Sequence, residues 1–136
     1  MANIFGQKGV AVTLAVAAVA GAHANLVTNG SFELGTNPGS FTTVATGGSN
    51  ITGWNVTSGS VDYIGTYWQS AEGSRNVDMS GSSLGRLSQS FATIPGFLYE
   101  VSFAYSGNPD SPTNGLRKTD VNIRETDTSS LLATKQ

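Results

Sequence analysis

Short segments of alternating hydrophobic and polar residues run along most of the chain, and this period of two predicts β-strands. The clearest alternation covers Leu98 to Ser106, which a Pro-Gly pair precedes and a Gly-Asn-Pro-Asp sequence follows. One face of this expected strand carries Tyr99, Val101, Phe103 and Tyr105. A second clear alternation covers Gly85 to Thr93, and the short connection between the two segments predicts an antiparallel pair.

Gln89 interrupts the hydrophobic row of the second segment, because it lies on the same face as Leu87 and Phe91. A buried amide needs hydrogen-bond partners, so we expect its side chain to bond a neighbouring backbone group. Weaker alternation predicts further strands at residues 25–28, 41–46, 52–57, 60–64, 75–80 and 119–125. Within these strands we expect Trp54 to point into the core.

Turn-forming residues separate these segments, and no window after residue 24 repeats apolar residues at the i, i+3, i+4, i+7 spacing of a helix. Many short strands with such punctuation predict an all-β fold, a β-sandwich or a barrel. We expect this domain to cover residues 25–125. Residues 126–136 show no further turn-and-strand unit, so we expect a C-terminal tail on a shortened domain.

Residues 1–24 have a different pattern. Lys8 precedes an apolar run from Val10 to Ala20, and Ala22-His23-Ala24 offers the small residues of a cleavage site. This order is typical of a secretory signal peptide, which we expect to form a helix detached from the domain, with cleavage after Ala24. The run is shorter than the roughly 20 apolar residues of a membrane-spanning helix. A retained membrane anchor is therefore the less favoured alternative, and we expect no stable span after processing.

The composition narrows the chemistry of the domain. The 136 residues include no cysteine and one histidine, and that histidine lies in the expected signal peptide. These counts exclude a disulfide framework, a thiolate metal site and a Ser-His-Asp or HExxH enzyme. Lys and Arg number 7 and Asp and Glu number 9, with no basic stripe, so a nucleic-acid partner is not expected. Export without cysteine favours a bacterial envelope or extracellular protein.

A series of motifs follows one order along residues 25–110. It consists of NLVTNGSFE at 25–33, ITGWNV at 51–56, SVDYIG at 60–65, NVDMSG at 76–81, GRLSQSF at 85–91, YEVSF at 99–103 and GNP at 107–109. The series resembles the choice-of-anchor C family, which is related to the domain-of-unknown-function 642 (DUF642) family of plant cell-wall proteins. The resemblance implies a secreted, non-catalytic β-sandwich with jelly-roll, galactose-binding-like topology. Bacterial members often end in one of several anchors, and no apolar tail with a basic flank follows Thr119 here.

Aromatic residues gather in a short stretch, where Tyr63, Tyr67 and Trp68 lie at the end of one expected strand and in the turn beyond it. Flat aromatic faces stack on sugar rings, and the neighbouring Asp62 and Gln69 offer hydrogen bonds to sugar hydroxyls. The alternative is a core position, above all for Tyr63, which shares a face with a valine. In an extended segment Tyr67 and Trp68 point in opposite directions, so we expect one of them to be exposed.

Together with the resemblance, this group predicts a secreted, monomeric, non-catalytic module whose partner is an extracellular or cell-envelope polysaccharide. The alternative is a structural or adhesive surface domain without a sugar ligand. Asp62 and Asp78 occupy equivalent positions in two expected strands, but such carboxylate pairs are common in β-proteins and do not indicate a glycosidase. We expect Asp78 to anchor a turn through its side chain.

The resemblance also implies a structural calcium ion, because galactose-binding-like modules often carry one near the first strand. Glu33 matches the acidic position of that site. Calcium takes six to eight oxygen ligands, which a Gly- and Asn-rich loop can supply. We therefore treat Glu33 as a candidate calcium ligand. The alternative is an exposed carboxylate or one paired with Arg75 or Arg86.

Overall fold

A computed structural model describes residues 11–13, 15–17, 23–111, 118–126 and 131–135 of the chain. These residues form an all-β fold without a helix, which confirms the predicted fold class. The strands are β1 (Ala11–Thr13), β2 (Ala15–Ala17), β3 (His23–Asn25), β4 (Phe41–Ala45), β5 (Asn55–Ser58), β6 (Ser60–Ile64), β7 (Asn76–Asp78), β8 (Arg86–Ser88), β9 (Ser102–Ala104), β10 (Val121–Arg124) and β11 (Leu131–Lys135). The ladders described between them are antiparallel, and the jelly-roll topology stays a prediction.

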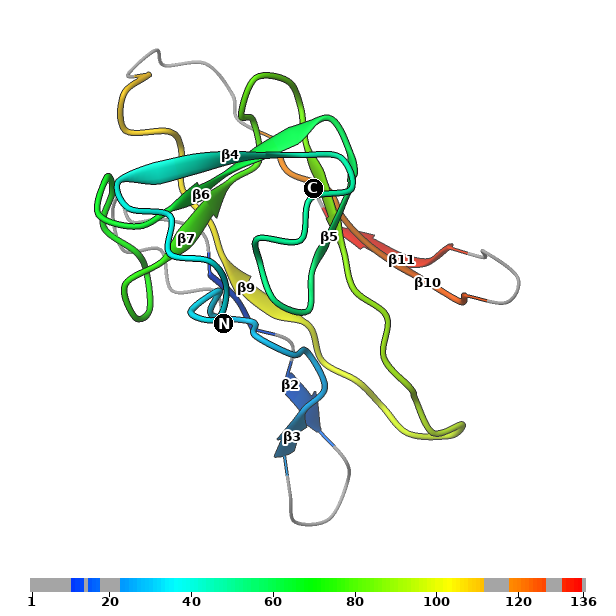
Figure 1. Ribbon diagram of the computed structural model, residues 1–136. Helices are drawn as coiled ribbons and strands as arrows, with labels where there is room; N and C mark the ends of the chain where they lie inside the picture. The colour runs from blue at the N-terminus through cyan, green and yellow to red at the C-terminus, as the bar shows by residue number, and fades with distance from the viewer. Residues whose placement is uncertain (1–10, 14, 18–22, 112–117, 127–130, 136) are drawn as a thin grey trace.

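A three-stranded sheet in the order β4–β6–β7 forms the centre of the fold (Figure 1). The middle strand, β6, is buried along nearly its whole length. Its alternation places Val61 and Tyr63 on the inner face of the sheet. The register sets Val44 of β4 opposite Val61 and Val77 of β7 opposite Tyr63. β-Branched and aromatic side chains favour such a pleated, buried surface, which explains why this segment forms a strand.

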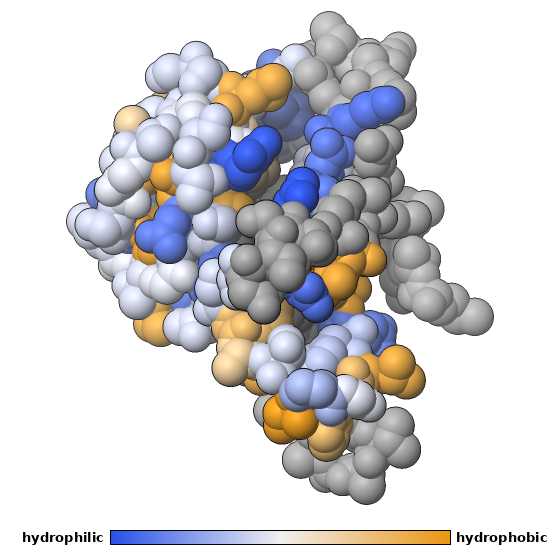
Figure 2. Space-filling model, turned by 90° about the vertical axis from the view of Figure 1, so that its right-hand side faces the viewer, coloured by the Kyte–Doolittle hydropathy of each residue, from blue (hydrophilic) through white to orange (hydrophobic). Residues whose placement is uncertain are grey.

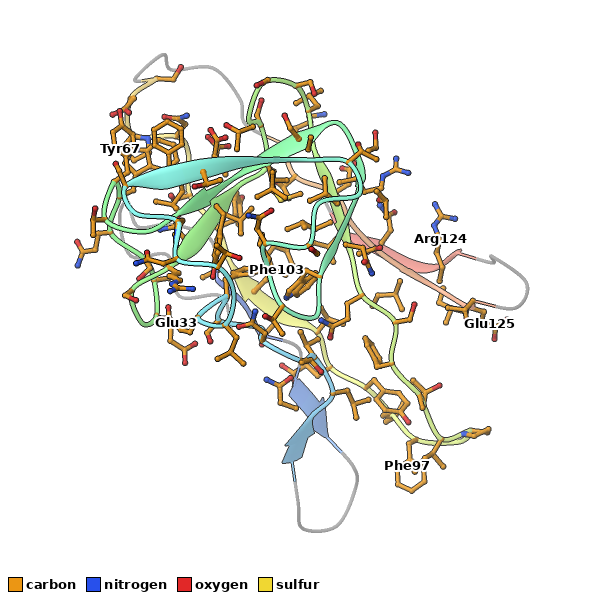
Figure 3. The ribbon with its side chains drawn as sticks, in the orientation of Figure 1. Glu33, Tyr67, Phe97, Phe103, Arg124 and Glu125 are labelled. Atoms are coloured by element: carbon orange, nitrogen blue, oxygen red, sulfur yellow. The ribbon has the colours of Figure 1, made fainter. Side chains whose placement is uncertain are left out.

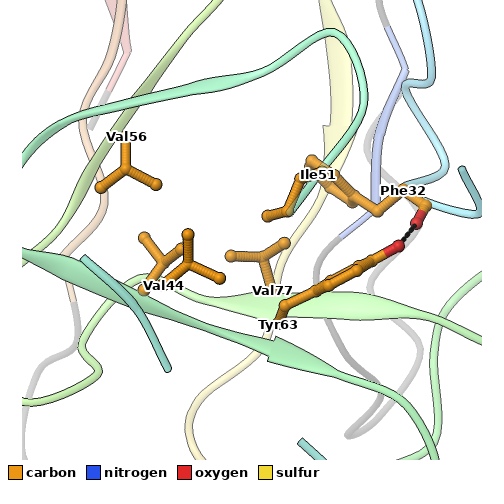
Figure 4. Packing of buried hydrophobic residues seen from close by; sticks show 7 residues of the cluster. Phe32, Val44, Ile51, Val56, Tyr63 and Val77 are labelled. Carbon is orange, nitrogen blue, oxygen red and sulfur yellow. Dashed lines mark hydrogen bonds between the residues drawn. The ribbon is translucent and has the colours of Figure 1, made fainter. Parts of the chain in front are cut away.

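Residues from outside this sheet cover its inner face. The hydrophobic core consists of Phe32, Val44, Ile51, Val56, Val61, Tyr63 and Val77 (Figure 4). Val56 comes from β5, which pairs with β8, while Phe32 and Ile51 come from the loops that surround β4. Trp54 packs against the edge of the core, and its Nε1 donates a hydrogen bond to the carbonyl of Asn29 at 3.0 Å. The predicted inward position of Trp54 is confirmed.

Several strand predictions agree with the structure. The segments predicted at 41–46, 60–64 and 119–125 correspond to β4, β6 and β10. Gln89 bonds backbone groups, as predicted. Its Oε1 accepts a hydrogen bond from the Thr28 N–H at 2.7 Å, and its Nε2 donates to the carbonyls of Thr28 and Gly53. The amide therefore joins the segment after β8 to the turns that contain Thr28 and Gly53.

The strand pairing corrects two predictions. Residues 85–93 and 98–106 do not pair with each other in the described ladders, because β8 pairs with β5 and β9 pairs with β1. The end of the chain, expected without a strand, forms β11, which pairs with β10. Alternation within one segment tells which side chains share a face. It carries no information on which distant strand that segment meets.

The N-terminal segment also differs from the expectation of a helix. Its described residues form β1, which pairs with β9, and β2, which pairs with β3. Val12, Thr13 and Val16 are β-branched, which favours strand over helix. The rest of residues 1–24 lies outside the described residues, and cleavage after Ala24 stays a prediction. Within the described ranges, no helix has the length and hydrophobicity needed to cross a membrane.

Candidate ligand-binding surface

The outer face of the β4–β6–β7 sheet carries two rows of side chains, at positions that alternate with the core residues. The register aligns Phe41, Ile64 and Asn76 in one row. It aligns Thr43, Asp62 and Asp78 in the next row. Ile64 and Asn76 are buried, whereas Phe41 at the edge of the sheet is 46% exposed. This face therefore joins an exposed aromatic edge to a row of hydroxyl and carboxylate groups.

Three aromatic side chains at that edge, Phe41, Tyr67 and Trp68, form a continuous surface that we call the aromatic platform (Figure 3). The ring centroids of Phe41 and Tyr67 lie 5.3 Å apart, and those of Tyr67 and Trp68 lie 5.4 Å apart. Residues 65–68 form a bend, and the N–H groups of Gly65 and Tyr67 both donate to the Ser40 carbonyl just before β4. The bend brings the rings of Tyr67 and Trp68 together. The opposite directions expected for an extended segment do not apply to this bend, whereas the expectation that one of the two rings is exposed is confirmed by Tyr67.

Asp110 holds two members of the platform. Its Oδ2 accepts a hydrogen bond from Nε1 of Trp68 at 3.3 Å. The hydroxyl of Tyr67 also bonds Asp110, and this bond, followed by the negative charge of Asp110 and a small contribution from burial, raises the pKa of Tyr67 above its usual value. Asn108 shapes the turn, because its Oδ1 accepts from the Asp110 N–H and its Nδ2 donates to Asp78 Oδ2. The 108–110 turn thus links the platform to the carboxylate row.

The link between Asp110 and Tyr67 gives a direct prediction. In Asp110→Asn, the pKa of the Tyr67 phenol should fall toward its ordinary value of about 10, because the neutral amide no longer disfavours the phenolate. Titration of the Tyr67 ring resonances by NMR measures this change. Asp120→Asn, at another exposed carboxylate, should leave the titration as in the unmodified chain. An unchanged Tyr67 titration in Asp110→Asn would contradict the geometry of the platform.

The structure separates the residues predicted to bind carbohydrate. Tyr63 is completely buried, so its ring belongs to the core and offers no face to a ligand. Tyr67 is 49% exposed and Trp68 is partly exposed, and both lie in the platform. Gln69 follows Trp68 and is exposed. Asp62 is on the same outer face, where its Oδ1 accepts a hydrogen bond from the Thr43 hydroxyl.

Three residues of this surface were missed by sequence reasoning, namely Phe41, Asn108 and Asp110. Phe41 is at an outward position of a predicted strand, since it alternates with inward residues of β4, and this parity was a usable signal. Asn108 and Asp110 lie in a predicted turn after β9. Nothing local in their sequence indicates that the turn returns to the bend at residues 65–68. That contact depends on the path of the chain in space.

The two carboxylates of the polar row, Asp62 and Asp78, accept hydrogen bonds that stabilise the neighbouring strand and turns. Asp78 Oδ1 accepts a hydrogen bond from the Ser80 N–H at 2.9 Å, which confirms the predicted turn anchor. Asp78 Oδ2 accepts from Asn108, and Asp62 accepts from Thr43. Asp62 and Asp78 lie directly opposite each other in the β6–β7 register. Both therefore stabilise the surface on which the platform lies.

Glu33 accepts three hydrogen bonds from the loop before β7. Its Oε1 accepts from the N–H groups of Ser74 and Arg75 at 2.8 and 2.7 Å, and its Oε2 accepts from the Ser74 hydroxyl at 2.7 Å. Partial burial raises the pKa of Glu33. The hydrogen bonds from Ser74 and Arg75, with the positive charge of Arg75, outweigh that effect and hold the pKa below its usual value. Gly73 has a positive φ of 64°, and a Cβ there would collide with the Glu33 carboxylate.

These contacts do not fit the calcium site implied by the resemblance. A calcium ion needs six to eight oxygen ligands, whereas three of the roughly four lone-pair sites of the Glu33 carboxylate already accept hydrogen bonds from N–H and O–H donors. No group of three or more His, Cys, Asp or Glu residues suited to a metal occurs among the described residues. Through these three hydrogen bonds Glu33 instead joins the loop before β7 to the start of the domain, an arrangement that we call the clamp. The alternative of a carboxylate beside Arg75 agrees better with this geometry.

The fold and this surface define a small all-β domain that presents an exposed aromatic platform. The chain belongs to the family described as "Protein of unknown function (DUF642)", whose profile matches residues 25–135. This match confirms the family relationship predicted from the motifs, and the narrower choice-of-anchor C name stays a prediction.

The chain is also similar to halomucin from Haloquadratum walsbyi (strain DSM 16790 / HBSQ001), with 37% identity over 119 residues. The alignment covers 82% of this chain and 1% of halomucin, so the chain spans a very small part of that relative. No solved structure shows a significant match to the chain.

Proposed function

We propose that this chain is a non-catalytic, extracellular module that binds a polysaccharide through the aromatic platform of Phe41, Tyr67 and Trp68. The observation that carries the proposal is one continuous surface of three rings, with Phe41 and Tyr67 exposed and Trp68 partly exposed, beside a row of polar side chains. Contiguous exposed apolar surface often marks a binding site, and recognition of a sugar needs both an apolar face and hydrogen-bonding groups.

The platform suits a glycan in three ways. The rings of Tyr67 and Trp68 offer apolar faces to the C–H groups of a pyranose ring. Asp110 keeps both rings in place before binding, which reduces the entropy that binding costs. Gln69 is exposed next to Trp68 and provides a donor and an acceptor for sugar hydroxyls. Such a surface binds with modest affinity per site.

A binding module fits the carboxylates better than a glycosidase does. A glycosidase needs one carboxylic acid that donates a proton and one free carboxylate that acts on the anomeric carbon or on water. Asp62 and Asp78 instead accept hydrogen bonds from Thr43, Ser80 and Asn108. We therefore propose that these groups support the surface and perform no chemistry.

Glycan binding tests the platform directly. In Trp68→Ala, we expect the affinity for a polysaccharide bound by the unmodified chain to fall about tenfold or more, because a stacking face is lost. Affinity electrophoresis in gels that contain neutral, acidic or amino-sugar polysaccharides measures this change. Phe97→Ala removes an exposed ring far from the platform and serves as the matched control. Circular dichroism verifies that both variants keep the fold.

Two outcomes would overturn the proposal. If the folded chain binds none of the polysaccharides, the domain functions as a structural or adhesive surface unit without a sugar ligand. If Trp68→Ala and Phe97→Ala weaken binding equally, the glycan binds elsewhere. The very large size of halomucin relative to the matching segment makes the structural role the second candidate.

A further inference from the structure

The segment between β8 and β9 extends away from the rest of the domain and turns back at residues 94–98, which we call the arm tip (Figure 1). Phe97 is labelled at its end in Figure 3. Three large apolar side chains of the tip are exposed, with 61% of Ile94, 45% of Phe97 and 75% of Leu98 accessible to solvent. Figure 2 looks onto the side of the molecule from which the arm projects, and hydrophobic residues gather in its lower part.

The arm also carries no charged side chain over a long stretch of sequence. Between Arg86 and Glu100 no residue is ionisable except Tyr99. Ordinary exposed turns carry polar or charged side chains, which keep the chain soluble and prevent association. The tip therefore presents apolar side chains at the place where a water-facing turn presents polar ones.

Ile94 and Phe97 of the tip form hydrogen bonds within the arm. Tyr99 Oη accepts a hydrogen bond from the Ile94 N–H at 2.5 Å and donates to the Ile94 carbonyl at 3.2 Å. The Phe97 N–H donates to the same carbonyl at 3.3 Å, and Pro95 has no N–H to satisfy. In an apolar medium each unpaired backbone group costs free energy, so these bonds lower the cost of moving the Ile94 and Phe97 groups out of water.

We propose that the arm tip inserts into the interfacial region of a lipid bilayer and docks the domain on a membrane surface. A protein partner fits this feature poorly, because a stable interface buries about 1,200 Å² or more of complementary surface and the tip is a narrow projection. A bilayer requires no matching shape and accepts apolar side chains to a depth of about 5–10 Å. Tyr99 lies at the base of the turn, where a tyrosine suits the boundary between headgroups and acyl chains.

Vesicle binding tests this inference, independently of any glycan. The purified chain should co-sediment with phosphatidylcholine vesicles, and Phe97→Asp should reduce its partition coefficient about tenfold or more. Leu84→Asp is the matched control, because Leu84 is 82% exposed but lies outside the arm, and its binding should equal that of the unmodified chain. Since the arm has no basic residue between positions 86 and 100, high salt should not release the chain.

A second readout separates insertion from a general loss of folding. Phe97→Trp should show a blue shift of its fluorescence when vesicles are added, whereas Leu84→Trp should show none. Trp68→Ala should bind vesicles as the unmodified chain does. The inference is overturned if the unmodified chain does not bind vesicles, or if Phe97→Asp and Leu84→Asp bind equally. It is also overturned if sedimentation without lipid shows a dimer that Phe97→Asp dissociates, because a second copy would then cover the tip.

Discussion

Replacement of Tyr63 by alanine is expected to lower the free energy of unfolding by about 3 to 5 kcal/mol. The ring is completely buried in the core of the central sheet, so its removal leaves a cavity. Its hydroxyl donates to the carbonyl of Phe32 at 2.6 Å and accepts from Nη1 of Arg75 at 2.6 Å. Phe32 has a positive φ of 62°, a conformation that a bulky residue keeps only when its surroundings hold it. Urea denaturation followed by fluorescence measures the change.

Two further variants show how much of this loss in unfolding free energy comes from the Tyr63 hydroxyl and how much from its buried ring. Tyr63→Phe keeps the ring and removes the hydroxyl, and we expect a loss of about 1 to 2 kcal/mol because the Phe32 carbonyl loses its donor. Tyr67→Ala removes an exposed tyrosine four residues further along the sequence and should change the unfolding free energy by about 0.5 kcal/mol or less. Equal effects of Tyr63→Ala and Tyr67→Ala would show that Tyr63 is not the centre of the core.

Local alternation predicted a large part of the strands, because burial on one face acts on every second residue. The segment at 60–64 is the best example, since each of its inward positions is a β-branched or aromatic residue and the strand has the predicted bounds. The predicted strand at 98–106 has a similar pattern but shortens to β9, at residues 102–104. Residues before it enter the arm, where no partner strand is described that would extend the ladder. A strand needs a partner as well as a pattern.

The candidate surface was predictable only in part, for a related reason. Tyr67 and Trp68 stood out because they lie with Tyr63 in a short stretch rich in aromatic residues. Tyr63 stood out equally, and only its parity with Val61 indicated the core. Asp110 had no local signal, because its role depends on the return of the 108–110 turn to a bend more than forty residues earlier. A residue that positions a site from a distant loop can be identified only from the three-dimensional structure.

Replacement of Glu33 by glutamine is expected to lower the free energy of unfolding by about 1 to 2 kcal/mol at neutral pH, after allowance for partial solvent exposure. The amide keeps one acceptor for the Ser74 and Arg75 donors, but its NH₂ group faces a donor where the second carboxylate oxygen accepted a hydrogen bond. Thermal and urea unfolding at neutral pH measure the loss. Glu72→Gln, at an exposed carboxylate in the same loop, is the matched control and should have little effect.

The dependence on pH gives this prediction its sharpest test. The pKa of Glu33 is lower in the folded chain than its usual value of 4.5, so folding favours the carboxylate. The stabilisation is therefore fully present above about pH 4.5 and is lost as the pH falls through the folded pKa. The unmodified chain should lose stability in this acid range, and Glu33→Gln should lose less.

Removal of divalent ions distinguishes between two roles of Glu33, the hydrogen-bonded clamp and a calcium ligand. Three donors fill most of the lone-pair sites of the Glu33 carboxylate, so the melting temperature should be the same with EDTA as with added calcium. A calcium ligand predicts a clear rise of the melting temperature with calcium in the unmodified chain and no rise in Glu33→Gln. That result would overturn the interpretation of Glu33 as a purely hydrogen-bonding group, because it would show that Glu33 ligates the ion.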